Sequence, residues 1–355
     1  MSPGKSSFLN FLRWTAALLV VVGHADMNLR SFQGIGEKWN SFGYIGLHSH
    51  AAVMIFFVLS GYVVSYATNK KYAIGNYGFR SYFLDRWSRI YSVLLPAIIF
   101  TLLIDYCGNH FISVYLDPAF LPQDHFVIRL FFNVFSLQGI QGYRVQLGSN
   151  PALWSIGYEF TFYFLYGLMF FRGGLFLKKL LIPVILLILV VIGYKMVVYF
   201  CIWLFGVVIH HATCKYRSTR FQPNAWVILL LIIFSNHFIN YNNIFNLPEL
   251  FRDVVFAITI ACALIFNPPP PPKWQVRVHA YCADFSYSIY AFHMPLIFFM
   301  CSIFINSFQM MPHILPGFII AFICILLARL FYSIGESRRS SFRFFASSIL
   351  ARVGL

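Results

Sequence analysis

The sequence predicts an all-α protein that crosses a membrane several times. Of its 355 residues, 59% are hydrophobic, 20% are aromatic and only 10% are charged, and the mean hydropathy is +0.72. Such a chain has too little polar surface for a soluble globule. Its apolar runs are long enough to span the ~30 Å hydrocarbon core of a bilayer as helices. We therefore predict a polytopic transmembrane helical bundle.

Ten apolar segments are the predicted spans, and one further segment is ambiguous. The spans cover approximately residues 8–27, 51–68, 90–107, 151–170, 180–194, 196–213, 224–239, 250–266, 283–305 and 314–334. The run 180–213 is interrupted only at 193–195, so it is either two spans joined by a tight turn or one long, kinked helix. The short segment 126–137 is interfacial or re-entrant rather than spanning.

Basic residues lie mostly on one side of the predicted membrane. An even number of spans puts both termini and every second loop on the same side of the membrane. Eighteen of the 26 Lys and Arg residues lie in these segments. By the positive-inside rule, both termini are cytoplasmic. The net charge of +15 is therefore a topology signal, and we expect no nucleic-acid partner.

The domain organisation is simple. Residues 1–335 form the predicted membrane domain, and its first apolar segment is expected to be a retained span rather than a cleaved signal peptide. Residues 336–355 form a basic cytoplasmic tail, which suits an amphipathic helix on the anionic inner leaflet. The seven cysteines have neither CxxC spacing nor histidines at ligand spacing, so we predict no disulfide framework and no metal site.

Two ionisable residues stand in the first predicted span. Arg13 and His24 are eleven positions apart, so they share one helix face and lie ~16 Å apart along the axis. Ionisable groups are costly in hydrocarbon. The pair is either a snorkelling arginine with a structural histidine, or a cation and a proton-transfer group of a membrane-embedded site.

Small and basic residues follow in and after the second span. Ser60 and Gly61 form a small pair, which either permits close helix packing or leaves room for a ligand. Arg86 and Arg89 are three positions apart on one helix face just before the third span. They suit either lipid headgroups or a phosphorylated cytoplasmic ligand.

Later spans carry further candidates. Glu159 lies about two turns into the fourth span, where an acid is a functional hypothesis by default. Trp154 and Ser155 precede it, and the tryptophan suits the membrane interface. His293 lies within the ninth span beside Pro295. That proline frees a backbone carbonyl, so the histidine is either its hydrogen-bonding neighbour or a residue of a pocket.

Six landmarks follow one another along the chain. They are Arg13-x10-His24, FFVLSG at 56–61, Arg86-x-x-Arg89, WSIGYEFTFY at 154–163, YSIYAFHMPL at 287–296 and Gly335-Glu336. In this order they resemble the landmarks of the acyltransferase family 3 membrane proteins. Members of that family are bacterial membrane enzymes that acylate, most often O-acetylate, cell-surface and secreted carbohydrates. The resemblance implies a multi-pass protein of the bacterial cytoplasmic (inner) membrane.

The resemblance also implies partners and residue roles. Membrane lipid, a glycan acceptor and acyl-CoA are the expected partners, and homo-oligomerisation stays open. Acetyl-CoA is the expected co-substrate, with no permanently bound cofactor. Arg86 and Arg89 would bind the donor phosphates, Arg13 would contact the pantetheine arm, and His24 would be the general base. Glu159 would orient His24, and the substrate pocket would draw on Ser60, Gly61, Trp154, Ser155 and His293.

Two alternatives stay open on the sequence alone. Transfer is either direct or proceeds through a covalent acyl-enzyme, with Ser60 or His24 as the carrier. A transporter or flippase of a lipid-linked glycan or a small anion would also place Arg, His and Glu in the membrane. Release of free CoA separates the enzyme from the transporter.

Overall fold

The computed structural model describes residues 1–33, 48–112, 115, 124–140, 145–171, 193–215, 223–241, 247–309, 311 and 315–352. Regular structure in these residues is helical, apart from one isolated bridge between Leu147 and Asn150. The all-α prediction is therefore confirmed for the described part of the chain.

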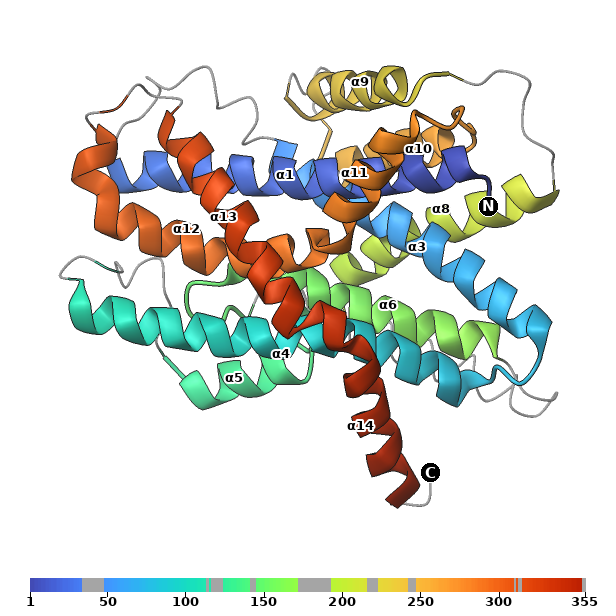
Figure 1. The fold of residues 1–355 in the computed structure, drawn as a ribbon, viewed down its shortest axis with the longest axis horizontal. Helices are drawn as coiled ribbons and strands as arrows, with labels where there is room; N and C mark the ends of the chain where they lie inside the picture. Colours follow the sequence, from blue (N-terminus) through green and yellow to red (C-terminus); the bar gives the residue numbers. More distant parts are fainter. Residues whose placement is uncertain are drawn as a thin grey trace. The chain divides into compact units, whose positions relative to one another are not determined.

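The helices follow one another in the order shown in Figure 1. They are α1 (Pro3–Gln33), α3 (His48–Ile74), α4 (Phe79–Phe111), α5 (Phe126–Val134), η2 (Pro151–Leu153), α6 (Trp154–Phe170), α8 (Tyr194–Lys215), α9 (Ala225–Asn236), η3 (His237–Tyr241), α10 (Glu249–Ala263), α11 (Lys273–Asp284), α12 (Ser286–Gln309), α13 (Leu315–Ile334), η4 (Glu336–Arg338) and α14 (Arg339–Arg352).

Six of the described helices are long and apolar enough to cross a membrane. The segments are Pro3–Leu29, Ser49–Ile74, Phe79–Phe111, Tyr194–Cys214, Ser286–Phe304 and Leu315–Arg352. Each overlaps one of the ten predicted spans. A shorter apolar helix, Trp226–Ile239, includes most of α9. Helices α6 and α10 are also shorter than these six, with 17 and 15 residues. The predicted span 180–194 falls almost wholly outside the described residues, so ten spans and cytoplasmic termini stay predictions.

The structure reduces the possible conformations of the two ambiguous segments, 126–137 and 180–213. Helix α5 has nine residues, which at 1.5 Å per residue is about 14 Å and too short to cross the hydrocarbon core. Gly193 has φ +87°, a left-handed conformation that cannot continue a right-handed helix. Helix α8 begins at the next residue, Tyr194. The run 180–213 is therefore not one uninterrupted helix.

The chain divides into two compact units. The first contains Met1–Ala67, Cys201–Tyr290 and Asn306–Ile323, and the second contains Thr68–Phe200, Ala291–Ile305 and Cys324–Leu355. The first unit therefore contains α1, α9, α10 and α11 with most of α3 and α8. The second contains α4, α5, α6 and α14 with most of α12.

Close backbone contacts join α3 and α8 within the first unit. A Cβ atom at Gly61 would lie 2.0 Å from the carbonyl oxygen of Trp203, and one at Gly206 would lie 2.0 Å from the carbonyl oxygen of Val58. No side chain larger than hydrogen fits at that separation. Small residues thus permit two apolar helices to approach closely, and Gly61 has this packing role.

Two prolines organise the packing of the second unit. Pro295 has no N–H for the Ala291 carbonyl, and that oxygen instead accepts a hydrogen bond from Asn150 Nδ2 at 2.9 Å. Pro96 likewise leaves the Ser92 carbonyl without its helical donor, and a Cβ at Gly335 would lie 2.4 Å from that oxygen. The glycine thus lets the end of α13 approach α4 close to Pro96.

Candidate functional site

The polar face of α1 belongs to the first unit. Helix α1 is continuous from Pro3 to Gln33, so Arg13 and His24 share a face as the spacing predicts. Both side chains are half-buried. One turn beyond His24, Asn28 Nδ2 donates to the His24 carbonyl oxygen at 2.8 Å. Asp26, two positions past His24, is buried with 3% of its surface exposed.

A second histidine, His50, interacts with His24 and is hydrogen-bonded to a buried acid, Asp253. His50, at the beginning of α3, is close enough to His24 for the two rings to interact electrostatically. His50 Nε2 lies 3.0 Å from Asp253 Oδ2. The Asp253 side chain is 2% exposed and that of His50 is 30% exposed. Three helices, α1, α3 and α10, thus bring together two imidazoles and a carboxylate, groups that can hold and move a proton.

Hydrogen bonding to Asp253 determines how His50 can act. A carboxylate accepts hydrogen bonds only, so it favours the His50 tautomer that carries its proton on Nε2. In the neutral ring the other nitrogen, Nδ1, is then an acceptor. His50 therefore presents a defined polarity to its surroundings, and Asp253 sets that polarity.

The arginine pair lies in the first turns of α4, in the second unit. Helix α4 has 33 residues, or about 50 Å, which exceeds the ~30 Å hydrocarbon core by several turns. Arg86 is buried, with 7% of its surface exposed. Its guanidinium carbon lies 5.7 Å from the ring centroids of both Tyr82 and Tyr163. These aromatic faces stabilise the buried cation.

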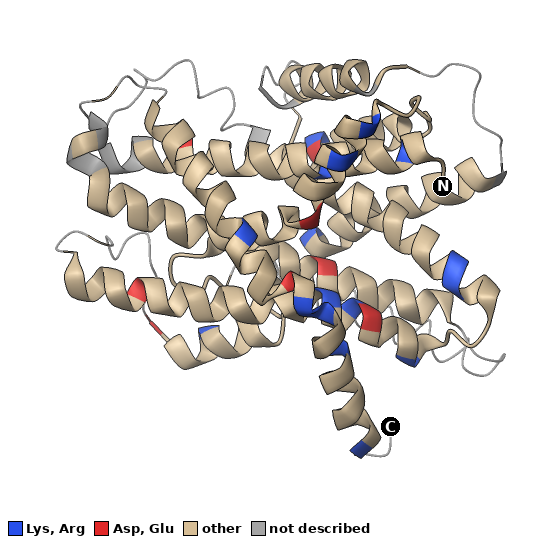
Figure 2. Ribbon diagram, viewed as in Figure 1, with Lys and Arg blue, Asp and Glu red and all other residues tan. Residues whose placement is uncertain are grey.

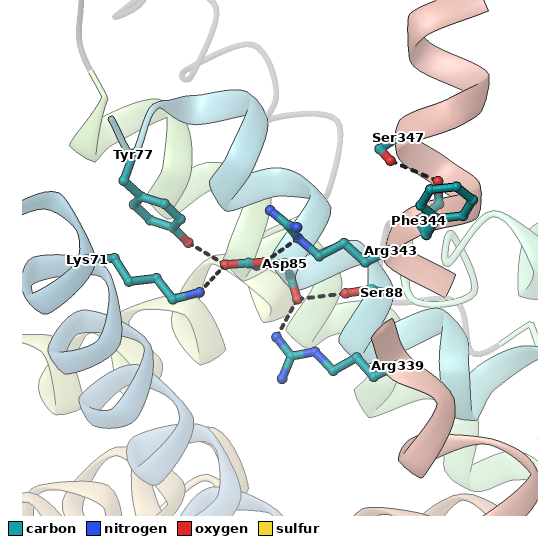
Figure 3. Close-up of polar contacts among 8 residues, drawn as sticks. All are labelled: Lys71, Tyr77, Asp85, Ser88, Arg339, Arg343, Phe344 and Ser347. Atoms are coloured by element: carbon teal, nitrogen blue, oxygen red, sulfur yellow. Dashed lines mark hydrogen bonds and ion pairs between the residues drawn. The ribbon is translucent and has the colours of Figure 1, made fainter. Parts of the chain in front are cut away.

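Asp85, next to Arg86, is the centre of a polar cluster (Figure 3). Its Oδ2 atom accepts hydrogen bonds from Lys71 Nζ and, at 2.9 Å, from the Tyr77 hydroxyl. Its Oδ1 atom pairs with Arg343 Nε at 2.8 Å, and its backbone oxygen accepts from Arg339 Nη2 at 2.8 Å. Burial and the neighbouring Asp85 carboxylate raise the pKa of Tyr77, so Tyr77 stays a neutral donor at physiological pH.

The C-terminal helix thereby contributes to the cluster. Arg339 and Arg343 stand in the first two turns of α14, which packs on α4. Basic and acidic residues gather where these two helices meet (Figure 2). Arg339 is also close enough to Arg86 and Arg89 for the three positive charges to repel one another. Four arginines from two helices thus converge on one part of the second unit.

Glu159 is connected to the same arginines through a tyrosine. The Tyr163 hydroxyl donates to Glu159 Oε1 at 2.5 Å, one turn along α6. The Tyr163 ring, in turn, lies over Arg86, and both Arg86 and Arg89 act electrostatically on its hydroxyl. Glu159 and His24 belong to different units, and the role of Glu159 in orienting His24 stays a prediction.

The remaining predicted pocket residues lie in both units. Trp154 packs against Tyr158 with ring centroids 5.0 Å apart, and Ser155 Oγ donates to the Ala152 carbonyl at 3.4 Å. His293 is buried in α12 with 1% of its surface exposed. In the first unit, Ser60 is half-buried beside Gly61. Their roles in a substrate pocket stay predictions.

Comparison with known proteins decides the family. A family model for the acyltransferase domain matches residues 6–330. The chain belongs to this family, acyltransferase family 3. An O-acetyl transferase of Shigella phage Sf6 is 28% identical over 164 residues, which cover 46% of this chain and 45% of that protein. The matched segment thus spans less than half of the relative's length. No solved structure matches the chain.

The family match covers most of the groups described above. In this acyltransferase-family chain, residues 6–330 include His24, His50, Asp253, Glu159 and the arginine pair. The match ends before η4 and α14, so Arg339 and Arg343 lie beyond it. The described residues contain no group of three or more His, Cys, Asp and Glu side chains that could hold a metal ion.

Sequence reasoning missed several residues of these clusters, among them Asp85 at the centre of the second one. Asp253 lies near the start of a predicted span, and an intramembrane acid is a signal that could have identified it. His50 is just outside the predicted second span, so it carried no such signal. Arg339 and Arg343 were assigned to the lipid surface because their partner, Asp85, is more than 250 positions away in the sequence.

Proposed function

We propose that this acyltransferase-family chain is a membrane-embedded O-acyltransferase. It takes an acyl group from acyl-CoA, with acetyl-CoA as the donor, on the cytoplasmic side of the bacterial inner membrane. It transfers that group to a hydroxyl of a cell-surface or secreted glycan. The family match and the O-acetyl transferase relative support the acyl-transfer chemistry, and the two polar clusters supply groups suited to its two substrates.

Donor binding is the role proposed for the arginines. Arginine presents several N–H donors in a planar fork, which pairs well with phosphate oxygens. Arg86 and Arg89 would bind phosphates of acyl-CoA, and Arg13 would contact the pantetheine arm. Arg86 is already held in place by two aromatic rings, so little side-chain entropy is lost when it binds an anion.

Proton transfer is the role proposed for His24. As the acceptor hydroxyl approaches, His24 takes its proton, and the oxygen attacks the carbonyl carbon of the thioester. The C–S bond then breaks, and the CoA sulfur receives the proton that His24 holds. An acyl-enzyme on Ser60 or His24 would give the same products in two steps.

The observation that carries the proposal is the pair formed by His50 and Asp253 beside His24. The 3.0 Å contact of His50 with the buried Asp253 fixes the ring and its tautomer. A fixed imidazole next to the base can orient it and stabilise the charge that develops during proton transfer. A purely structural histidine on α1 would not require a second histidine backed by a buried acid.

Purified protein in lipid nanodiscs tests the proposal. Labelled acetyl-CoA and surface polysaccharide are added, and free CoA and labelled glycan are measured. We expect both products from the wild-type chain. His24→Ala should lower the rate by ~10²- to 10⁴-fold, the usual contribution of a positioned base. His110→Ala is the matched control, because His110 is an exposed histidine in α4.

The outcomes separate the enzyme from the transporter. Release of CoA that depends on His24, with unchanged membrane abundance of the variant, supports acyl transfer. Glycan movement across vesicles without CoA release would instead indicate a transporter or flippase. Mass spectrometry of surface glycans from cells with and without the chain would then identify the acylated sugar.

A further inference from the structure

The cluster around Asp85 contains more positive than negative charge. Among the described residues, five cationic side chains meet there: Lys71, Arg86, Arg89, Arg339 and Arg343. Asp85 and Glu159 oppose them, and Glu336 in η4, which packs on α4 and α14, is a third carboxylate in this region. Arg86 is buried, and its Nε atom has no hydrogen-bond acceptor. Arg89 and Arg339 are half-buried, whereas the Lys71 and Arg343 side chains are each 47% exposed. Like charges repel more strongly where water is excluded, so the three more buried arginines favour a ligand that carries several negative charges.

Asp85 connects α4 to α14 through two contacts. Its carboxylate pairs with Arg343, and its backbone oxygen accepts from Arg339 (Figure 3). No residue of α14 is buried, and Phe344 and Phe345 are 76% and 60% exposed. The beginning of α14 is therefore positioned by polar contacts with α4 and not by burial of apolar side chains.

The position of Arg339 follows from this arrangement. One nitrogen, Nη2, donates to the Asp85 carbonyl, and the guanidinium remains close to Arg86 and Arg89 despite their repulsion. A guanidinium has five N–H donors, so one hydrogen bond leaves several for an anion. Phosphate groups have the charge and the number of acceptor oxygens that this triad of arginines requires.

The structure assigns Arg339 to the donor site as a third phosphate-binding arginine, with Asp85 as the residue that positions it through α14. This inference rests on the proposed function, because it takes the ligand to be acyl-CoA. The shared chemistry is the phosphate group, and anionic lipid headgroups are the other source of it. The basic tail then serves the active site in addition to any contact with the membrane.

The test compares donors with and without phosphates. Acetyl-CoA and S-acetylpantetheine carry the same thioester, but S-acetylpantetheine lacks the phosphates. In phosphatidylcholine nanodiscs, Arg339→Gln should raise the Kd of acetyl-CoA by ~10- to 100-fold, the range for a hydrogen bond to a charged group. The kcat/KM with S-acetylpantetheine should not change. Arg338→Gln is the matched control, since Arg338 is the adjacent, exposed arginine.

Asp85→Asn provides a second, independent variant. It weakens the pairs with Lys71 and Arg343 but keeps the backbone oxygen that Arg339 uses. Loss of the Arg343 pair frees the beginning of α14 and with it Arg339, so we expect a raised KM for acetyl-CoA and a nearly unchanged kcat. A lowered KM, which the added net positive charge alone would give, would contradict the positioning role of Asp85. Asp85→Glu should restore part of the affinity, because it returns the charge.

Each outcome bears on the assignment. Equal acetyl-CoA affinity in wild type and Arg339→Gln would overturn it, as would an equal loss of kcat/KM with both donors. An effect of Arg339→Gln confined to nanodiscs that contain phosphatidylglycerol would show a lipid site and also overturn it. A wild-type chain that neither binds acetyl-CoA nor releases CoA would instead refute the proposed function.

Discussion

Replacing Asp253 with asparagine reverses the hydrogen bonding of His50 while conserving the volume of the side chain. The carboxylate of Asp253, whose side chain is only 2% exposed, accepts a hydrogen bond from His50 Nε2 at 3.0 Å. Asparagine can turn its NH2 group toward Nε2 and donate instead, and the proton of His50 then moves to Nδ1. The ring consequently presents a donor where the wild-type ring presents an acceptor.

The size of the effect follows from the kind of contact that is lost. Hydrogen bonds to charged groups contribute ~1.5–3 kcal/mol. Each 1.4 kcal/mol corresponds to a tenfold change in rate. If this stabilisation acts on the charge that develops on His24, Asp253→Asn should lower kcat ~10- to 100-fold. The KM for acetyl-CoA should stay close to the wild-type value, because Asp253 has no role in phosphate binding.

The assay is release of free CoA by the purified protein in nanodiscs, with thermal unfolding as a check on folding. Asp284→Asn is the control, because Asp284 is an exposed aspartate at the end of α11. His50→Gln provides a second route to the same result and avoids a change at the fully buried acid. Wild-type kcat in both Asp253→Asn and His50→Gln would refute the role that we give to this pair.

Two further predictions concern stability. Gly61→Ala should destabilise the protein by ~1–3 kcal/mol, because its Cβ would overlap the Trp203 carbonyl oxygen at 2.0 Å. Gly317→Ala is the control, because a Cβ at that helical position meets nothing within 4 Å. It should leave the melting temperature unchanged or raise it slightly. Burial lowers the pKa of His279 below its usual 6.5, so the folded state favours the neutral ring and stability should fall as the pH drops below about 6.5. His279→Gln should reduce this loss in melting scans from pH 7 to pH 5, and an unchanged pH dependence would contradict the assignment.

Local features of the sequence predicted the all-helical class and two arrangements within single helices. The spacing of Arg13 and His24 requires only that one helix contain both, and α1 does. Pro295 removes a donor wherever it stands in a helix, so a freed carbonyl was predictable. Its actual partner, Asn150, was not predictable, because that residue comes from a loop more than 140 positions away. Periodicity describes one helix and contains no information about which helix packs beside it.

The candidate site shows the same limit more sharply. Arg13, His24 and Glu159 stood out because ionisable groups are expensive in a membrane. Residues outside the apolar runs carry no such penalty, so nothing in the sequence distinguished Arg339 and Arg343 from Arg338 or Arg352. Only the contact with Asp85 separates them. The tail therefore read as a uniform basic segment, although its first two turns have a defined partner.

The two clusters differ in the chemistry that they can influence, and that difference should appear in the kinetics. Phosphates of the donor are remote from the bond that breaks, so arginines that bind them contribute equally to the ground state and the transition state. Variants of Arg86, Arg89 or Arg339 should therefore act mainly on KM. The hydroxyl proton moves only as the reaction proceeds, so His24, His50 and Asp253 should act mainly on kcat. A structural role for either cluster would lower the apparent kcat through loss of folded protein and would leave KM unchanged, so each rate is referred to the folded fraction of the variant. At equal folded protein, KM effects at the arginines and kcat effects at the histidine cluster are thus what acyl transfer requires and what a purely structural role does not produce.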